Sequence, residues 1–193
     1  MKIRKYLKND EKDWLQCRLL SFFDTSYYDN IVRKKENYDN NAINLVAIED
    51  NKIIGFIDVE IEKIKKQACY LEGKLGGVIW ELGVLPEYRN KKTATRLLER
   101  AITLAKAKNI CRFEAWTQDD IPINYWYKKH NFQYKEGYLN VFADQGKLVS
   151  DEIGKILGVR IVNFEASLDR KDELVKKYKR VHEVRLYELK FDE

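Results

Sequence analysis

The alternation of apolar and polar positions in the first third of the chain predicts three strands. Residues 2–7 form a short alternating run, and two longer runs rich in Ile and Val occupy positions 44–49 and 53–61. Between the longer runs stand Asp50 and Asn51, which favour the left-handed backbone of a tight hairpin turn. This part of the chain is therefore expected to form an edge strand followed by a β-hairpin.

Two segments show the spacing of amphipathic helices. Residues 11–23 carry apolar side chains at i, i+4, i+7 and i+8, after a capping residue at Asn9 or Asp10. Residues 93–106 carry a wider apolar face, from which the basic side chains point away. We expect both faces to be buried; they consist of Leu15, Leu19, Phe22 and Phe23 in the first helix, and of Ala94, Leu97, Leu98, Ala101, Ile102 and Ala105 in the second.

Strands and helices alternate in the rest of the chain, which is the pattern of a mixed α/β (α+β) fold. No proline-rich linker or low-complexity segment divides the sequence, so we expect a single domain over residues 1–193. The further predicted elements are strands at 78–84, 111–116, 133–143, 159–168 and 184–191, and helices at 120–129, 150–157 and 169–180.

Composition narrows the function classes. The chain has 193 residues, of which 45% are hydrophobic, and a formal net charge of +5, which suits an anionic ligand but falls short of a dedicated nucleic-acid-binding domain. Its cysteines (Cys17, Cys69 and Cys111) are widely spaced and indicate neither a disulfide framework nor a zinc site. No run approaches the roughly 20 apolar residues of a membrane span. We expect a cytoplasmic protein without a metal, a membrane or a nucleic acid as partner.

The run 78–102 is the most informative stretch of the sequence. A predicted strand ends, a basic loop follows, and the amphipathic helix begins at once. A helix start presents unpaired backbone N–H groups and the positive end of the helix dipole, and Arg89, Lys91, Lys92 and Arg96 add full charges around it. This arrangement is typical of a phosphate-binding site.

The pattern Arg-Asn-Lys-Lys-Thr-Ala at 89–94 resembles the coenzyme A signature of the GNAT superfamily of N-acetyltransferases, Arg/Gln-x-x-Gly-x-Gly/Ala after a strand. The run 124–132 resembles the later Tyr-x-x-x-Gly-Phe element of that family, with Tyr127 and Phe132 in place. The resemblance implies a central mixed, mostly antiparallel twisted sheet of about seven strands, with helices on both faces. Residues 145–180 are then an insertion in the final hairpin or part of a C-terminal elaboration.

Two residues depart from the family pattern. Lys92 stands where a loop glycine is usual, and Asn131 replaces the glycine before Phe132. Glycine at such positions permits a positive φ and close approach of the backbone to phosphate. Asparagine tolerates the left-handed region, so the change at Lys92 is the more serious one. It motivates an alternative function, a non-catalytic acyl-CoA-binding or regulatory module.

The resemblance implies that the protein transfers an acetyl group from acetyl-CoA directly to a primary amine of a small molecule or a peptide. Acetyl-CoA is then the cosubstrate. It would be held by a strand whose ladder opens near its glycine and by the loop and helix start that follow. The implied cofactor-binding residues are Leu82, Gly83, Val84, Arg89, Asn90, Lys91, Lys92, Thr93, Ala94 and Thr95.

Two side chains are candidates for proton transfer. Glu81 stands in a strand rich in Val, Ile and Leu, where desolvation would raise its pKa towards that of a base; the alternative is a solvated glutamate on a half-buried strand. Tyr127 carries a phenol of reference pKa about 10, which could protonate a leaving thiolate of pKa about 8.5. The alternative is a core role within the aromatic cluster 125–127.

Other polar residues carry weaker signals. His130 and His182 have no motif partner and are expected at the surface. The segment 24–29 predicts an ordinary polar loop, with the wall of a pocket for a cation as the alternative. The basic run 169–180 predicts a surface helix, with RNA binding as the alternative. We expect 145–180 to border the acceptor site, although it would also suit a homodimer interface.

Overall fold

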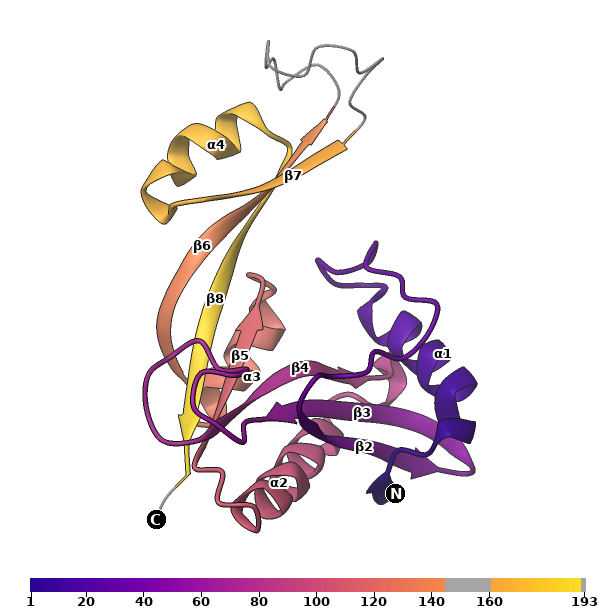
Figure 1. The fold of residues 1–193 in the computed structure, drawn as a ribbon. Coiled ribbons are helices and arrows are strands. Elements are labelled where there is room, and N and C mark those ends of the chain that lie inside the picture. Colours follow the sequence, from indigo (N-terminus) through magenta and orange to yellow (C-terminus); the bar gives the residue numbers. More distant parts are fainter. Residues whose placement is uncertain (145–160, 192–193) are drawn as a thin grey trace.

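The computed structural model describes residues 1–144 and 161–191, and these residues form one twisted sheet of eight strands in the order β1-β2-β3-β4-β5-β8-β6-β7 (Figure 1). All neighbouring strands are antiparallel except β4 and β5. The sheet has one strand more than the seven expected, because β7 extends its far edge. The strands are β1 (Lys2–Lys5), β2 (Asn41–Glu49), β3 (Lys52–Ile61), β4 (Gly76–Val84), β5 (Arg112–Thr117), β6 (Gln133–Asp144), β7 (Ile161–Ala166) and β8 (Arg180–Lys190).

Helices cover both faces of the sheet, as expected. Gly55 and Phe56 are neighbours on β3 and face opposite sides. The Phe56 ring packs on Trp14 of α1, whereas a Cβ at Gly55 would meet Thr93 of α2. We call these two sides the α1 face and the α2 face. The α-helices are α1 (Glu11–Phe22), α2 (Thr93–Lys106), α3 (Ile121–Lys129) and α4 (Lys171–Lys177), and short 3-10 turns cover Lys8–Asp10, Pro86–Tyr88 and Leu168–Arg170. No described helix has the length and apolar character needed to cross a membrane.

The hairpin and the second helix are confirmed. Asp50 and Asn51 have φ values of 48° and 60°, which is the left-handed geometry of a tight turn between β2 and β3. The buried residues of α2 are Thr93, Leu97, Leu98, Ala101 and Ala105, so the predicted apolar face does lie on the sheet.

The predicted buried stripe of α1 is wrong at Leu19 and Phe23, whereas Leu15 and Phe22 are partly buried and pack against the core. Leu19 and Phe23 are 43% and 70% exposed, while Arg18 and Ser21 are buried together with Trp14 and Cys17. The reason is the surface beneath the helix. A Cβ at Gly83 of β4 would meet the Cβ of Ser21, so only a small side chain fits there. Arg18 is buried because it has a carboxylate partner on the same strand.

The strands β4 and β5 separate soon after they begin. Only residues 76–78 of β4 pair with residues 112–114 of β5, in parallel. Beyond these pairs each strand continues without the other. We call the opening between their C-terminal halves the β4–β5 wedge. The opened ladder that the resemblance implied is therefore present.

A β-bulge lies on β4 at Trp80, three residues before the glycine near which the ladder was expected to open. Asp58 opposes Glu81 while the next residue of β3 opposes Ile79, which leaves Trp80 as the extra residue. Gly83 is needed for another reason, since a side chain there would overlap the Phe56 ring.

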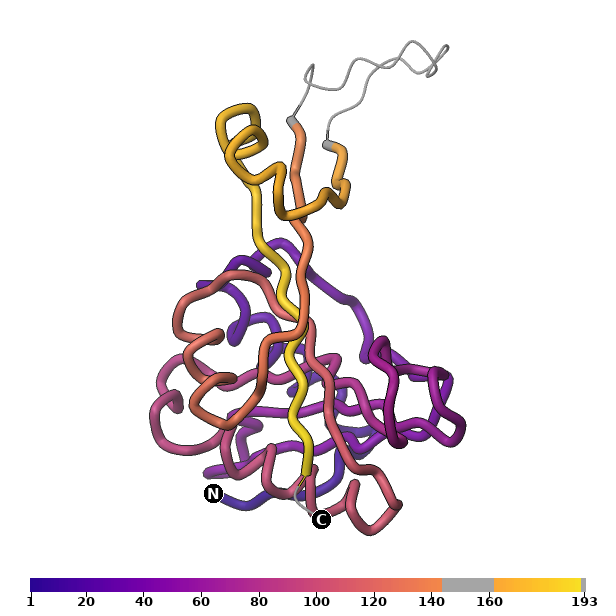
Figure 2. Tube along the Cα trace, turned by 90° about the vertical axis from the view of Figure 1, so that its left-hand side faces the viewer, coloured from indigo at the N-terminus to yellow at the C-terminus, as the bar shows by residue number. Residues whose placement is uncertain are grey.

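The last two strands of the core, β6 and β8, form an antiparallel hairpin that rises away from the rest of the molecule (Figure 2). Between them the chain builds β7 on the free edge of β6, and α4 packs on β6 to form a second small core. The described residues 161–179 thus lie between β6 and β8, and we call them the hairpin insertion. The helix predicted at 150–157 lies outside the described residues. The second core contains Leu139, Val141, Ala143, Leu174 and Tyr178.

Candidate active site

The loop that follows β4 turns through left-handed backbone at Asn90 and Lys92. Lys92 has a φ of 62°, so the left-handed conformation expected at this position is present although the residue is not glycine. Lys92 is also the N-cap of α2, and its carbonyl accepts the N–H of Arg96 at 3.0 Å. The first turn of α2 contains no acidic residue. The second glycine-like position, Asn131, has a φ of 64°.

Arg89 is held by the end of α1. Its two terminal nitrogens donate to the Asp24 carboxylate at 2.5 and 2.7 Å, and one of them also donates to the Ser21 carbonyl at 2.9 Å. The hydrogen bonds to Arg89 lower the pKa of Asp24 and raise that of Arg89. The guanidinium therefore ties the segment after α1 to the basic loop.

Thr95 has a partner that sequence reasoning missed. Its hydroxyl lies 2.8 Å from Nε2 of His130, whose Nδ1 lies 2.8 Å from the Trp126 carbonyl. Because a carbonyl only accepts, Nδ1 carries the proton, and in the neutral ring Nε2 accepts from Thr95. His130 joins α3 to the start of α2. The ring of His130 also stacks on that of Trp126, four residues earlier, at 4.1 Å.

Glu81 lies on the α1 face of β4 in an ion pair with Arg18. Nε and Nη2 of Arg18 are both 2.8 Å from the same carboxylate oxygen, and Arg18 also donates to the Asn30 carbonyl at 2.7 Å. Burial raises the pKa of Glu81, although Arg18 opposes the shift. The side chain keeps 16% of its surface exposed, so it is desolvated without being sealed off.

A second buried ion pair lies beside Glu81. Asp58, its cross-strand neighbour, is 2.6 Å from the ammonium of Lys35, and both side chains are almost fully buried. Burial raises the pKa of Asp58 to about 6. The Lys35 ammonium is also enclosed by three rings, with centroids 4.8 to 5.4 Å away; they belong to Tyr6, Trp14 and Tyr38.

Tyr127 is buried on the α2 face, where α3 packs on β8. Its ring stacks on Tyr187 at 5.4 Å and meets Phe132 edge-on at 5.0 Å. Burial raises its pKa, and an electrostatic contribution comes from the phenol of Tyr27, which belongs to the segment on the opposite face. The hydroxyl of Tyr27 accepts the N–H of Gln118 at the end of β5.

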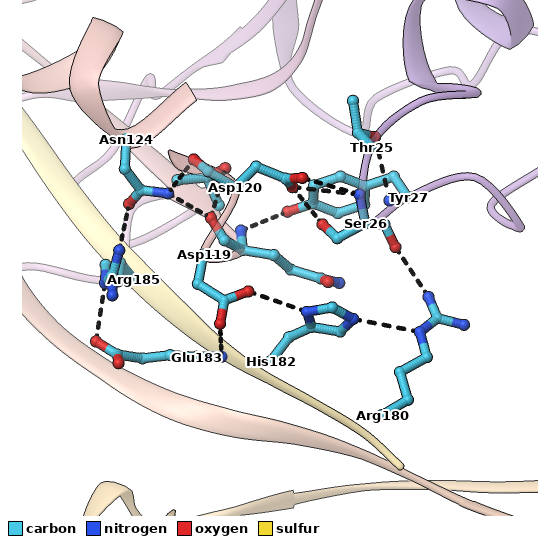
Figure 3. A network of polar contacts seen from close by, with 12 residues as sticks. Thr25, Ser26, Tyr27, Asp119, Asp120, Asn124, Arg180, His182, Glu183 and Arg185 are labelled. Atoms are coloured by element: carbon cyan, nitrogen blue, oxygen red, sulfur yellow. Dashed lines mark hydrogen bonds and ion pairs between the residues drawn. The ribbon is translucent and has the colours of Figure 1, made fainter. Parts of the chain in front are cut away.

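The polar segment 24–29 is fixed across the mouth of the wedge. Asp120 accepts from the backbone N–H of Ser26 at 3.0 Å and also bonds its hydroxyl, while Arg180 of β8 donates to the Ser26 carbonyl (Figure 3). Arg180 also donates to Asp29. The segment therefore links the basic loop, where Asp24 holds its arginine, to β5 and β8.

His182 belongs to the same network and is not the isolated surface residue that was expected. Arg180 donates through Nε to Nε2 of His182 at 3.3 Å, and His182 Nδ1 is 2.9 Å from Asp119 (Figure 3). Since Nε2 accepts, the proton of the neutral ring is on Nδ1 and is donated to Asp119.

Within residues 1–144 and 161–191, no group of three or more His, Cys, Asp or Glu side chains could hold a metal ion. Cys17, Cys69 and Cys111 are free.

The family model of the acetyltransferase (GNAT) family matches residues 8–132. This is more than half of the chain, and the chain belongs to the acetyltransferase (GNAT) family. Family membership implies an acyltransferase. Among curated proteins, no sequence matches the chain.

Solved structures share the fold. A GNAT-family acetyltransferase from Streptococcus pneumoniae has 17% identity and a TM-score of 0.60, and the match covers 98% of this chain and 99% of that one. The apo aminoglycoside antibiotic 6'-N-acetyltransferase AAC(6')-IG from Acinetobacter haemolyticus has 23% identity and a TM-score of 0.53, over 70% and 93% of the two chains. The PaiA N-acetyltransferase from Thermoplasma acidophilum, in complex with coenzyme A, has 18% identity and a TM-score of 0.52, over 70% and 91%. At these identities the similarity shows the fold alone.

Proposed function

We propose that the protein is an N-acetyltransferase that moves an acetyl group from acetyl-CoA directly to a primary amine. The observation that carries the proposal is the β4–β5 wedge together with the left-handed turn at Lys92. An opened parallel pair leaves backbone donors and acceptors on β4 without a strand partner. A helix start at its end offers N–H groups and positive charge to phosphate.

The phosphates of acetyl-CoA would lie on the loop 90–95, with Lys91, Lys92 and Arg96 exposed around it. The pantetheine arm would follow the free edge of residues 82–84 into the wedge. In support, the α2 start has no acidic residue to repel phosphate, and the left-handed backbone at Lys92 lets the loop turn without glycine. The coenzyme A complex of the PaiA N-acetyltransferase, which has the same fold, supports a cosubstrate of this class.

Glu81 and Tyr127 would divide the proton transfers. An alkylamine of pKa ~10.4 is mostly protonated at neutral pH, so a base must remove its proton before it attacks a thioester. Glu81 would act as that base, directly or through water, on the α1 face. Tyr127 would donate a proton to the departing thiolate from the α2 face. Tyr127 is preferred to Tyr125, which is 66% exposed and points away from the core.

The alternative of a non-catalytic acyl-CoA-binding module rested on Lys92. Its backbone has the conformation that glycine would supply, so the substitution gives no reason to expect a disabled loop. The RNA-binding alternative rested on residues 169–180. There Arg170 pairs with Glu173 and Lys171 with Glu183, while Leu174 is buried, which is how an ordinary surface helix is built.

We further propose that the chain forms a single domain and works in the cytoplasm on a small-molecule amine. The hairpin insertion would also suit the interface of a homodimer. The three free cysteines agree with a reducing compartment.

A thiol-release assay with acetyl-CoA and a broad panel of amines tests the function. We expect release that depends on one class of amine. If the protein binds coenzyme A in calorimetry but releases no thiol with any amine or peptide, the non-catalytic alternative replaces the proposal. The catalytic assignment predicts that Glu81→Gln lowers turnover about 10² to 10⁴-fold.

A further inference from the structure

Three aromatic side chains form a continuous wall on the β5 side of the wedge. Tyr70 comes from the loop between β3 and β4, Trp116 from β5 and Tyr138 from β6. The rings of Tyr70 and Trp116 are 5.5 Å apart, and so are those of Trp116 and Tyr138. The backbone of Tyr70 is fixed, because its N–H donates to the buried carboxylate of Glu114 at 2.7 Å. We call Tyr70, Trp116 and Tyr138 the aromatic wall.

The carboxylate of Glu136 stands at the end of this wall that Tyr70 forms. Trp116 and Glu136 both oppose Leu186 in the sheet register, so the three side chains share one face. The Glu136 carboxylate raises the pKa of the Tyr70 phenol, so the two groups interact electrostatically. Glu136 is exposed.

The carboxylate of Glu165 stands at the opposite end of the wall, beside Tyr138, and comes from the hairpin insertion. Tyr138 opposes Val184, which is two residues from Leu186 and so lies on the same face. Glu165 of β7 opposes Asn140, the next residue of β6 on this face. Burial and the nearby Glu165 carboxylate raise the pKa of the Tyr138 phenol, and Glu165 is exposed.

Neither carboxylate is neutralised by the described part of the chain. Within residues 1–144 and 161–191 neither Glu136 nor Glu165 forms an ion pair, and the neighbouring Lys135 pairs with Glu188 instead. One cation of the described residues, Lys66, lies beside the wall. Its ammonium lies 5.5 Å from the Tyr70 ring centroid and pairs with Glu72. The Tyr70 ring of the wall thus already contacts one ammonium, that of Lys66. The carboxylates of Glu136 and Glu165 remain without an ion-pair partner in the described residues.

The wall and Glu81 stand on opposite sides of the wedge but on the same face. Val78 and Glu114 are the last residues at which β4 and β5 pair. Glu81 lies three residues further on β4, about 10 Å along the strand, and Trp116 lies two residues further on β5, about 7 Å along it. A molecule that reaches both must span the opening.

We propose that the acceptor is a small molecule with at least two amino groups, one of which reacts at Glu81 while another, still charged, binds the aromatic wall between Glu136 and Glu165. The inference rests on the proposed function, because it concerns the acceptor of that reaction. Ammonium groups bind aromatic faces and exposed carboxylates, and a bound second amine would set the distance and orientation of the first.

The experiment compares spermidine with the monoamine butylamine in the thiol-release assay. We expect kcat/KM for spermidine to exceed that for butylamine at least tenfold. The double variant Glu136→Gln/Glu165→Gln should lose about tenfold in kcat/KM for spermidine and leave butylamine unchanged. The matched control is Glu99→Gln, an exposed glutamate on α2, which should behave as wild type. Equal use of both amines, or a double variant equal to the control, would overturn the proposal.

Calorimetry of spermidine binding without acetyl-CoA separates this inference from the proposed function. If no amine gives thiol release but spermidine binds, and Trp116→Leu and the double variant weaken that binding, the proposed function fails while the cation site stands. If spermidine does not bind wild-type protein, or if a lysine peptide is acetylated equally by wild type and double variant while spermidine is not used, the inference is wrong.

Discussion

Arg18 of α1 reaches the carboxylate of Glu81 on β4, with its Nε 2.8 Å from Oε1, although the two residues are 63 positions apart in sequence. The candidate base is thus held by a permanent cation on the helix that covers the α1 face. Burial raises the pKa of Glu81 and Arg18 opposes that shift, so the balance between them sets the pH at which the base is available.

Removal of Arg18 should move the acidic limb of the rate profile upward. A carboxylate acts as a base only above its pKa, so a raised pKa places the limb above the ordinary range for glutamate. In Arg18→Met the pKa of Glu81 rises further, because burial remains and the opposing charge is lost. We expect the limb of kcat/KM to shift to higher pH, with the plateau at alkaline pH changed much less. A pH profile of thiol release measures this, with Lys12→Met on the exposed side of α1 as the control. An unshifted limb in a folded Arg18→Met protein would show that Glu81 does not titrate in the reaction.

Tyr127→Phe should lower turnover and leave coenzyme A affinity nearly intact. The substitution removes only the hydroxyl from a buried ring that stacks on Tyr187, so the packing is retained. Loss of a general acid typically costs about 10² to 10⁴ in rate. The control is Tyr125→Phe on the exposed side of the same helix, which should be as active as wild type. Equal activity of the two variants across pH 6 to 9 would remove the acid role from Tyr127.

Arg89→Ala should weaken coenzyme A binding more than tenfold. Arg89 is anchored by Asp24 and by the Ser21 carbonyl, so its removal takes away a positive charge and also releases the loop from α1. Charged hydrogen bonds of this kind are worth roughly 1.5 to 3 kcal/mol each. Calorimetry with coenzyme A measures the change, and Arg100→Ala, an exposed arginine further along α2, is the control. If both variants bound coenzyme A with wild-type affinity, the phosphate site would lie elsewhere.

Lys92→Gly should stabilise the protein. The left-handed conformation at Lys92 costs a residue with a Cβ about 1 to 2 kcal/mol, and glycine avoids that cost. We expect the free energy of unfolding in urea to rise by about 1 kcal/mol. The neighbour Lys91 is not in the positive-φ region, so Lys91→Gly should instead lower stability by about 0.5 to 1 kcal/mol. The opposite order of the two variants would contradict the role of backbone strain at this turn.

The elements that the sequence predicted well are those in which local chemistry and tertiary position agree. Asp50 and Asn51 favour the turn they adopt, and the apolar face of residues 93–106 is wide enough to leave one way of packing. The basic loop at the end of β4 was also predictable, because the apolar pattern of the helix begins directly after the basic residues.

The structural features that the sequence did not predict depend on contacts between residues that are far apart in the chain. The helix 11–22 buries Arg18 because Glu81 stands beneath it, and no spacing of apolar residues encodes that ion pair. His130 was missed for the same reason, since its partner Thr95 lies 35 residues earlier. The bulge at Trp80 follows from how β4 is paired with β3, which a glycine three positions later did not reveal.

The fate of a labelled acetyl group tests the central claim most directly. Acetyl-CoA labelled in the acetyl group would be incubated with the protein and with spermidine, butylamine and a lysine peptide, and both the amines and the protein would be analysed by mass spectrometry. The account predicts label on a primary amine, in amounts equal to the thiol released, with no labelled protein intermediate and with the reaction lost in Glu81→Gln. Label that accumulates on the protein, or an amine product that forms equally well in Glu81→Gln, would contradict direct transfer with Glu81 as the base.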